Sequence, residues 1–167
     1  MRRINILKTI VDYVWLVTVP LGILVVIACI PGIFIMEEIV DIMEFPTGNA
    51  PITIYTKLLM CLEVISFLLI LLAFHFFRNT LRYFQRVKIF DPKVICHFRN
   101  IGTLLIISGA ISFSISIIVN IYYQGTVKLF FGFNNDIVLI VLGLFFQVLS
   151  EVFKIGKNAK EENELTI

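Results

Sequence analysis

Charged residues are scarce in this sequence. They make up 16% of the 167 residues, whereas a soluble domain typically has about 25%. Apolar residues make up 59% and are gathered into long runs, a segregation that the core of a soluble domain does not need. This scarcity argues against a water-soluble domain and predicts a membrane protein with several spanning segments.

Cysteine and histidine are also rare. The three cysteines, Cys29, Cys61 and Cys96, have no metal-binding or redox spacing, and an odd number implies no disulfide framework. The two histidines, His75 and His97, lie on different predicted helices. The sequence contains no HExxH motif, nucleophile elbow or phosphate-binding loop. We therefore expect no metal, no cofactor and no enzymatic activity.

Four apolar runs are long enough to cross a bilayer as helices, which takes about 20 residues each. Pro20 and Gly22 could kink the first run, and Pro31 and Gly32 are expected to end its regular helix. We predict an all-α membrane protein, a single domain with four transmembrane helices. The predicted spans cover residues 10–35, 57–77, 101–123 and 137–155.

The first run is too long for a cleaved signal peptide, and no small-residue cleavage site follows it. The residues before Cys29 resemble a lipoprotein processing site, so lipidation of Cys29 stays open. A retained helix is favoured, because the apolar run continues to Ile35.

Basic residues gather in three of the segments outside the spans. Positively charged segments stay in the cytoplasm, so we expect both termini and residues 78–100 inside. The acidic connector 36–56 and the connector 124–136 then lie outside. Of the fourteen Lys and Arg residues, three lie in residues 1–8, six in 78–99 and three in 154–160.

The inner connector, residues 78–100, is predicted to be a helical hairpin that extends spans two and three into the cytoplasm. Its apolar residues Leu81, Phe84 and Val87 form a stripe with helical spacing. Asp91 is a preferred N-cap and Pro92 a favoured first helical residue, so the second arm should begin at Pro92. Its candidate contacts to anionic lipid headgroups or to a protein partner are Arg78, Arg82, Arg86, Lys88, Lys93 and Arg99.

The tail, residues 156–167, carries three carboxylates that could fold back onto the hairpin cations: Glu161, Glu162 and Glu164. A partner could then compete with the tail. Lys157–Glu161 and Lys160–Glu164 are also spaced for pairs along one helix. The hairpin cations are too few for a nucleic-acid-binding module, so no direct nucleic-acid binding is expected.

Two short elements are expected outside the membrane. Residues 36–45 place acidic and apolar side chains with the spacing of an amphipathic helix at the outer interface. Residues 52–56 alternate with period two, and residues 126–130 could form a second strand. Together the two strands would make a small β element.

Glu63 is the outstanding polar residue inside a span, because a central charge costs about 2.5–3.5 kcal/mol to insert. Glu63 and Ser116 each lie seven residues from the outer end of their spans, so the two could share a hydrogen bond. A carboxylic acid that fixes helix register is the favoured interpretation. Ion or proton handling and snorkelling to the outer interface are the alternatives.

The third span carries serines with a strict spacing of four residues: Ser108, Ser112 and Ser116. Small residues at this spacing let transmembrane helices approach closely. Packing therefore explains the stripe, and a polar pathway is the alternative.

Gln147 and Glu151 lie near the inner end of the fourth span. His75 and Arg78 lie at a comparable depth on the second. We expect Glu151 to pair with Arg78 or with His75, as a structural ion pair rather than a catalytic one.

The four-span layout, the inner connector FFRNTLRYFQRVKIFDPKVICHFRNIG and the ending KEENELTI resemble one known family over nearly the whole chain. It is the bacterial membrane family known as domain of unknown function 2975. The resemblance implies an integral membrane protein without established activity or catalytic residues. Members are often encoded beside a small helix-turn-helix regulator, which implies a regulatory or sequestering role. Asp91-Pro92 stands where Asn or another polar residue is usual, which changes only the local capping.

Two functions follow as expectations for a protein of the bacterial cytoplasmic membrane. The first is a non-enzymatic interaction protein that docks a cytosolic partner through the hairpin and the tail. The second is a small transporter or ion-handling subunit, centred on Glu63 and the serine stripe. A homo-oligomer is compatible with both.

Overall fold

The computed structural model describes residues 2–35, 53–86, 89–124 and 135–165, and nearly all of them are helical. All four helices are long and apolar enough to cross a membrane, which confirms the all-α fold with four spanning segments. The elements are α1 (Arg2–Ile35), α3 (Ile54–Gln85), α4 (Pro92–Gln124) and α5 (Asn135–Leu165).

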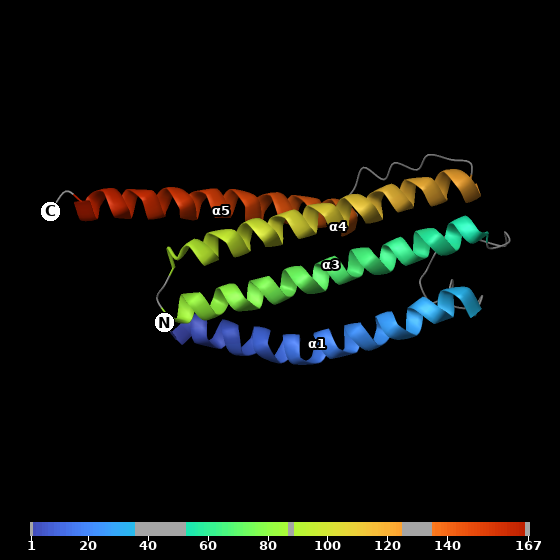
Figure 1. Cartoon of the computed structure of the whole chain (residues 1–167), viewed down its shortest axis with the longest axis horizontal. Helices are drawn as coiled ribbons and strands as arrows, with labels where there is room; N and C mark the ends of the chain where they lie inside the picture. The colour runs from blue at the N-terminus through green and yellow to red at the C-terminus, as the bar shows by residue number, and fades with distance from the viewer. Residues whose placement is uncertain (1, 36–52, 87–88, 125–134, 166–167) are drawn as a thin grey trace.

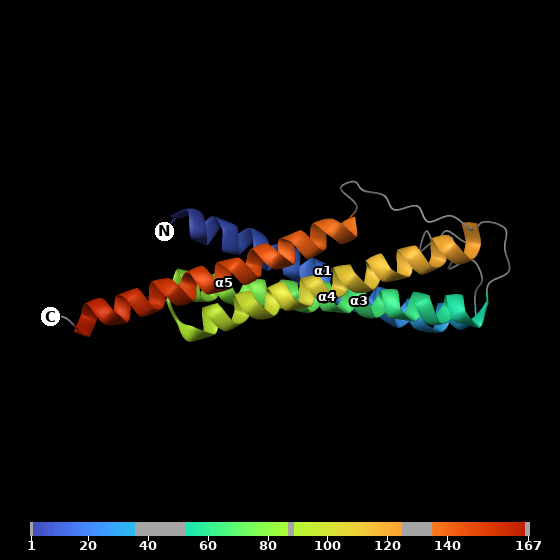
Figure 2. The ribbon, with the colours of Figure 1, turned by 90° about the horizontal axis from the view of Figure 1, so that it is seen from above.

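The helices form an open row rather than a closed bundle. α1 packs against α3, α3 against α4, and α4 against α5, and no other pair of described helices has its backbones in close contact. Figure 1 shows the four helices stacked in this order, and Figure 2 shows that they cross at shallow angles. The position of a helix in the row therefore decides which polar side chains can meet.

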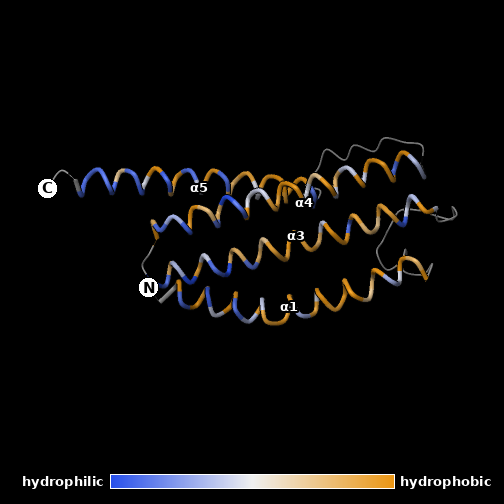
Figure 3. The backbone as a smooth tube through the Cα atoms, viewed as in Figure 1, coloured by the Kyte–Doolittle hydropathy of each residue, from blue (hydrophilic) through white to orange (hydrophobic). Residues whose placement is uncertain are grey.

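Both termini lie at the end of the row where α3 and α4 are joined, here called the hairpin end (Figure 1). Hydrophilic residues are concentrated there, above all along the last turns of α5 (Figure 3). Gly156 of α5 touches the ring of Phe90 beside the hairpin turn. The remaining nine residues of α5 rise about 13 Å further.

Two local expectations were wrong. Pro31 and Gly32 lie inside α1, which continues to Ile35, because neighbouring helices and local adjustments accommodate proline in membrane helices. Residues 54–56 begin α3 instead of forming a strand, and Thr53 is its extended N-cap. Five alternating residues are too few to outweigh a 32-residue helical run. The expected strand 126–130 and amphipathic helix 36–45 lie outside the described residues.

The hairpin follows from local capping chemistry. α4 begins at Pro92, and the side-chain Oδ1 of Asp91 accepts a hydrogen bond from the backbone N–H of Lys93 at 2.9 Å. This contact satisfies one of the N–H groups that the first turn of a helix leaves unpaired. α3 ends at Gln85, so two continuous helices carry the polar residues on either side of the turn.

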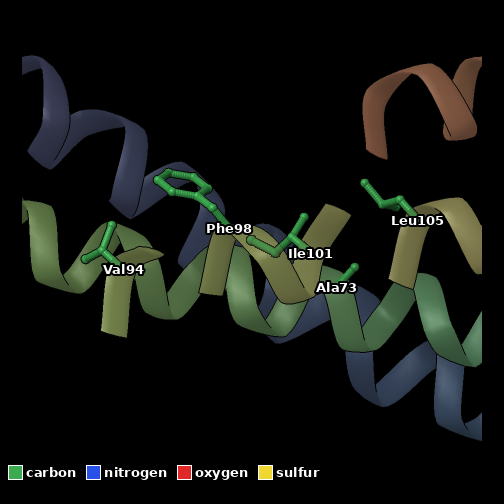
Figure 4. Packing of buried hydrophobic residues seen from close by; sticks show 5 residues of the cluster. All are labelled: Ala73, Val94, Phe98, Ile101 and Leu105. Carbon is green, nitrogen blue, oxygen red and sulfur yellow. The ribbon is translucent and has the colours of Figure 1, made fainter. Parts of the chain in front are cut away.

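The largest apolar cluster lies between α3, α4 and α5 towards the hairpin end. Ala73, Val94, Phe98, Ile101 and Leu105 are its buried members (Figure 4). The ring of Phe98 stacks on those of Phe146 and Phe153 of α5, with centroids 5.9 and 5.2 Å apart. Stacked aromatic pairs add to the stability gained by burial, so this cluster fixes the hairpin against α5.

Glycines bring α4 and α5 into backbone contact. A Cβ atom added to Gly102 would lie 2.7 Å from the carbonyl oxygen of Gly143, and one added to Gly109 would lie 2.7 Å from the carbonyl oxygen of Asp136. Such close approach is typical of membrane helices that pack through small residues.

Gly102→Ala should therefore destabilise the protein, by about 1–3 kcal/mol for an overpacked contact. Gly22→Ala is the matched control, because its Cβ would meet the movable end of the Leu71 side chain, 2.8 Å away. We expect that control to change stability by at most about 0.5 kcal/mol. Thermal unfolding of the purified protein in detergent measures both, and equal midpoints would contradict the backbone contact.

Candidate functional sites

A buried serine cluster joins α3 to α4. The Oγ atom of Ser66 lies 2.8 Å from that of Ser108 and 2.9 Å from that of Ser112. The hydroxyls of Ser66 and Ser108 each also donate to the backbone carbonyl of the other residue, both at 3.1 Å. Two of the three predicted stripe residues thus face α3. Sequence reasoning missed Ser66, although it lies one turn along the same helix from Glu63.

Glu63 belongs to the same polar seam. Its Oε1 atom accepts a hydrogen bond from the hydroxyl of Ser112 at 2.8 Å. The expected partner, Ser116, lies one turn away, and its backbone carbonyl accepts from the amide of Asn120. The prediction was wrong by one helical turn: Glu63 meets Ser112 and not Ser116.

A cavity of about 450 Å³ opens beside Glu63 and touches all four helices. Asp136 in the first turn of α5 lines it as well. Carboxylate and hydroxyl oxygens can hold a hard cation or pass a proton. Asp136 was not among the site residues predicted from the sequence. The polar lining consists of Glu63, Ser66, Ser112, Asn135 and Asp136, beside apolar residues and Cys29.

Arg78 pairs with Asp12 of α1 rather than with Glu151. Its Nε atom donates to Asp12 Oδ1 at 2.6 Å, and its guanidinium lies 4.0 Å from the ring centre of Trp15. Lys8 adds a second cation 3.5 Å from Asp12. This group is partly buried, so solvent screens it less than an exposed pair.

Glu151 lies 3.9 Å from Lys154 of its own helix, and the two side chains are 68% and 60% exposed. The expected pairing with Arg78 or His75 is wrong because α4 lies between α3 and α5 in the row. His75 instead shares a hydrogen bond with the amide of Asn79 at 2.9 Å. Gln147 packs against Gly102, and with Glu151 and Arg99 it lines a groove between α4 and α5.

A second polar cavity, of about 380 Å³, lies between α3 and α4 at the hairpin end. We call it the basic pocket, because Arg82, Arg86 and Lys93 line it. None of these three cations forms an ion pair with a described carboxylate. The rings of Tyr83 and His97 pack together at its side, with their centroids 5.8 Å apart. Lys88 lies outside the described residues. The lining residues are Asn79, Arg82, Tyr83, Arg86, Lys93 and His97.

The acidic tail is part of α5. Glu161 lies 3.4 Å from Lys157, and Glu164 lies 3.6 Å from Lys160. Both carboxylates thus contact their own helix instead of folding back onto the hairpin. Residues 157–165, here called the arm, continue α5 past the hairpin turn (Figure 1).

Among residues 2–35, 53–86, 89–124 and 135–165, no three His, Cys, Asp or Glu side chains gather as they would around a metal ion. Cys29 is half-buried inside α1 and packs against a small apolar cluster around Val26 and Met60. Two polar cavities are therefore the candidate sites: the cavity beside Glu63, here called the carboxylate cavity because Glu63 and Asp136 line it, and the basic pocket.

The sequence matches the family described as protein of unknown function (DUF2975) over residues 7–167. The chain belongs to the DUF2975 family. Comparisons with curated proteins and with solved structures found no match. A family of unknown function assigns no role to a residue, so the two cavities must be judged on their chemistry.

The single tryptophan offers a test of the contact between α1 and α3. Asp12→Asn and Arg78→Gln should both alter the fluorescence emission of Trp15. The first removes the carboxylate that holds the Arg78 guanidinium over the ring, and the second removes the guanidinium itself. Glu151→Gln should leave the spectrum unchanged. A spectral change in Glu151→Gln alone would contradict the Asp12–Arg78 contact and support the predicted pairing of Glu151 with Arg78.

Proposed function

We propose that this DUF2975 member is a non-enzymatic interaction protein of the bacterial cytoplasmic membrane. In this proposal the hairpin end faces the cytoplasm and docks a cytosolic protein. The distribution of cations supports the orientation, since positively charged segments stay inside. Both termini and the hairpin turn share that end (Figure 1), as an even number of spans requires.

The arm is the observation that carries the proposal. It is polar almost all round, and the pairs Lys157–Glu161 and Lys160–Glu164 stabilise it along its own length. A helix that is polar on every face buries nothing in its own chain, and it is suited to water or to a partner. The arm projects beyond the hairpin, where the described residues of the other helices do not reach it (Figure 1).

The charges define the partner's chemistry. Arg82 in the last turn of α3, Arg86 at its C-cap and Lys93 on α4 offer a positive surface beside the hairpin turn, so a partner with an acidic patch would fit there. Complementary potentials speed association and select the partner more than they add affinity. The resemblance to DUF2975 members implies a small helix-turn-helix regulator as the first candidate.

A crosslinking pull-down from native membranes tests the docking. The triple charge reversal of Arg82, Arg86 and Lys88 to Glu should reduce partner recovery at least tenfold, because like charges then face the acidic patch. Deleting residues 157–167 should reduce it independently. Arg99→Glu with Lys154→Glu is the control, since both residues lie outside the basic pocket. Unchanged recovery in both test variants would refute the proposal.

Ion handling is the second candidate, and the carboxylate cavity favours it. Glu63 lies inside a span and shares this cavity with Asp136, and a bound cation or proton would reduce the cost of a carboxylate at that depth. Glu63→Gln should then abolish cation or proton flux in proteoliposomes, and Glu151→Gln should not. Flux that persists in Glu63→Gln would make Glu63 a structural residue whose role is its bond to Ser112.

A further inference from the structure

We propose that the basic pocket binds the phosphate headgroup of an anionic phospholipid, taken from the leaflet at the hairpin end. The inference goes beyond protein docking and does not depend on it. Charge, depth in the bilayer and the surface below the pocket support it independently.

The charge of the pocket calls for an anion. Arg82, Arg86 and Lys93 line one cavity, and none of them pairs with a carboxylate among the described residues. Like charges in one site repel, and a bound anion would remove that cost. The two guanidinium groups can each grip a phosphate with two parallel hydrogen bonds, while the lysine acts as a point charge.

The remaining lining suits a headgroup rather than a bare ion. The amide of Asn79 and the hydroxyl of Tyr83 lie on the α3 side of the pocket and offer hydrogen bonds to glycerol or ester oxygens. The cavity of about 380 Å³ falls within the range for small organic ligands, roughly 300–1,000 Å³. A single phosphate would fill only part of it.

The depth of the pocket selects a lipid. The apolar part of α3 ends at Phe77, so Asn79 and Arg86 lie two and nine residues beyond it. At 1.5 Å per residue these positions are about 3 and 13 Å past the hydrocarbon edge. The headgroup layer is roughly 5–8 Å thick on each side. The base of the pocket therefore lies at the level where lipid phosphates lie.

The surface below the pocket can take the acyl chains. On α3 the face beneath Asn79 continues 7, 11 and 14 residues earlier in the sequence, at the spacing of one helical stripe. On α4 the same face passes Asn100 and Leu104, which are half-buried, and reaches Ile107, 14 residues after Lys93. Four apolar positions on these two faces are exposed: Leu72 (45%), Leu68 (39%), Ile65 (49%) and Ile107 (45%). A polar pocket at headgroup level thus runs into an open apolar face of the same two helices.

Native mass spectrometry of the full-length protein in detergent tests the site, with phosphatidylglycerol as the probe and phosphatidylcholine as the neutral reference. One phosphatidylglycerol per chain should be retained. Arg82→Gln and Lys93→Gln should each weaken that retention about tenfold, as expected for the loss of one charge-assisted contact. Both side chains are exposed, so both variants should fold, and circular dichroism checks this.

Arg99→Gln is the matched control, because it removes the same charge at a similar depth but lines another groove. If Arg99→Gln weakens retention as much as Arg82→Gln, the attraction is diffuse and the discrete site is refuted. Inorganic phosphate is titrated in parallel. Displacement of phosphatidylglycerol by millimolar phosphate would show a site for soluble anions and overturn the lipid assignment.

Deleting residues 157–167 separates this inference from protein docking. The deletion should leave phosphatidylglycerol retention unchanged, since the arm does not line the pocket. Loss of lipid on deletion would place the binding site on the arm and contradict the proposal, whatever the pull-down shows.

Discussion

The two faces of α4 hold the row of helices together. Apolar side chains gain little by leaving lipid for another helix, so membrane helices associate through close packing and interhelical hydrogen bonds. α4 supplies one of these on each side. Ser108 and Ser112 hydrogen-bond to Ser66 of α3, and Gly102 and Gly109 let the backbone of α5 approach. Without α4, α3 would keep only α1 as a neighbour, and α5 would have no neighbour among the described helices.

The interactions differ from one helix contact to the next. α1 and α3 are tied at several levels, by Asp12 with Arg78, by Asn5 with Gln85 and by Lys57 with the carbonyl of Phe34. α4 and α5 are tied by glycine packing and by stacked aromatic rings. The contact of α3 with α4, here called the seam, contains both Glu63 and the basic pocket. The two candidate sites thus share one contact between helices.

Sequence reasoning succeeded where the cause was local. Asp91 and Pro92 start α4 because capping depends on adjacent residues alone. The serine stripe faces another helix because a spacing of four residues fixes one face. It failed where the answer depended on the lateral order of the helices. Hydrophobic runs do not state whether α5 lies beside α3, and for that reason Glu151 was assigned to Arg78.

The depth predicted for Glu63 was wrong for a related reason. Hydropathy marks where a run is apolar, whereas the helix continues for as long as its backbone hydrogen bonds can form. α3 begins before its apolar run and α4 ends after its own, yet Glu63 is still nine residues from the start of α3 and Ser116 eight from the end of α4. The partner is nevertheless Ser112. The turn of α4 that meets Glu63 therefore depends on how the two helices pack and not on where they end.

The two sites lie on one continuous helix. Glu63 and Arg82 are 19 residues apart on α3, which corresponds to about 28 Å along its axis. α3 contains no proline or glycine between them, and such residues are the usual origins of sharp kinks. A movement of α3 against α4 at the Glu63–Ser112 contact would therefore also displace the α3 wall of the basic pocket.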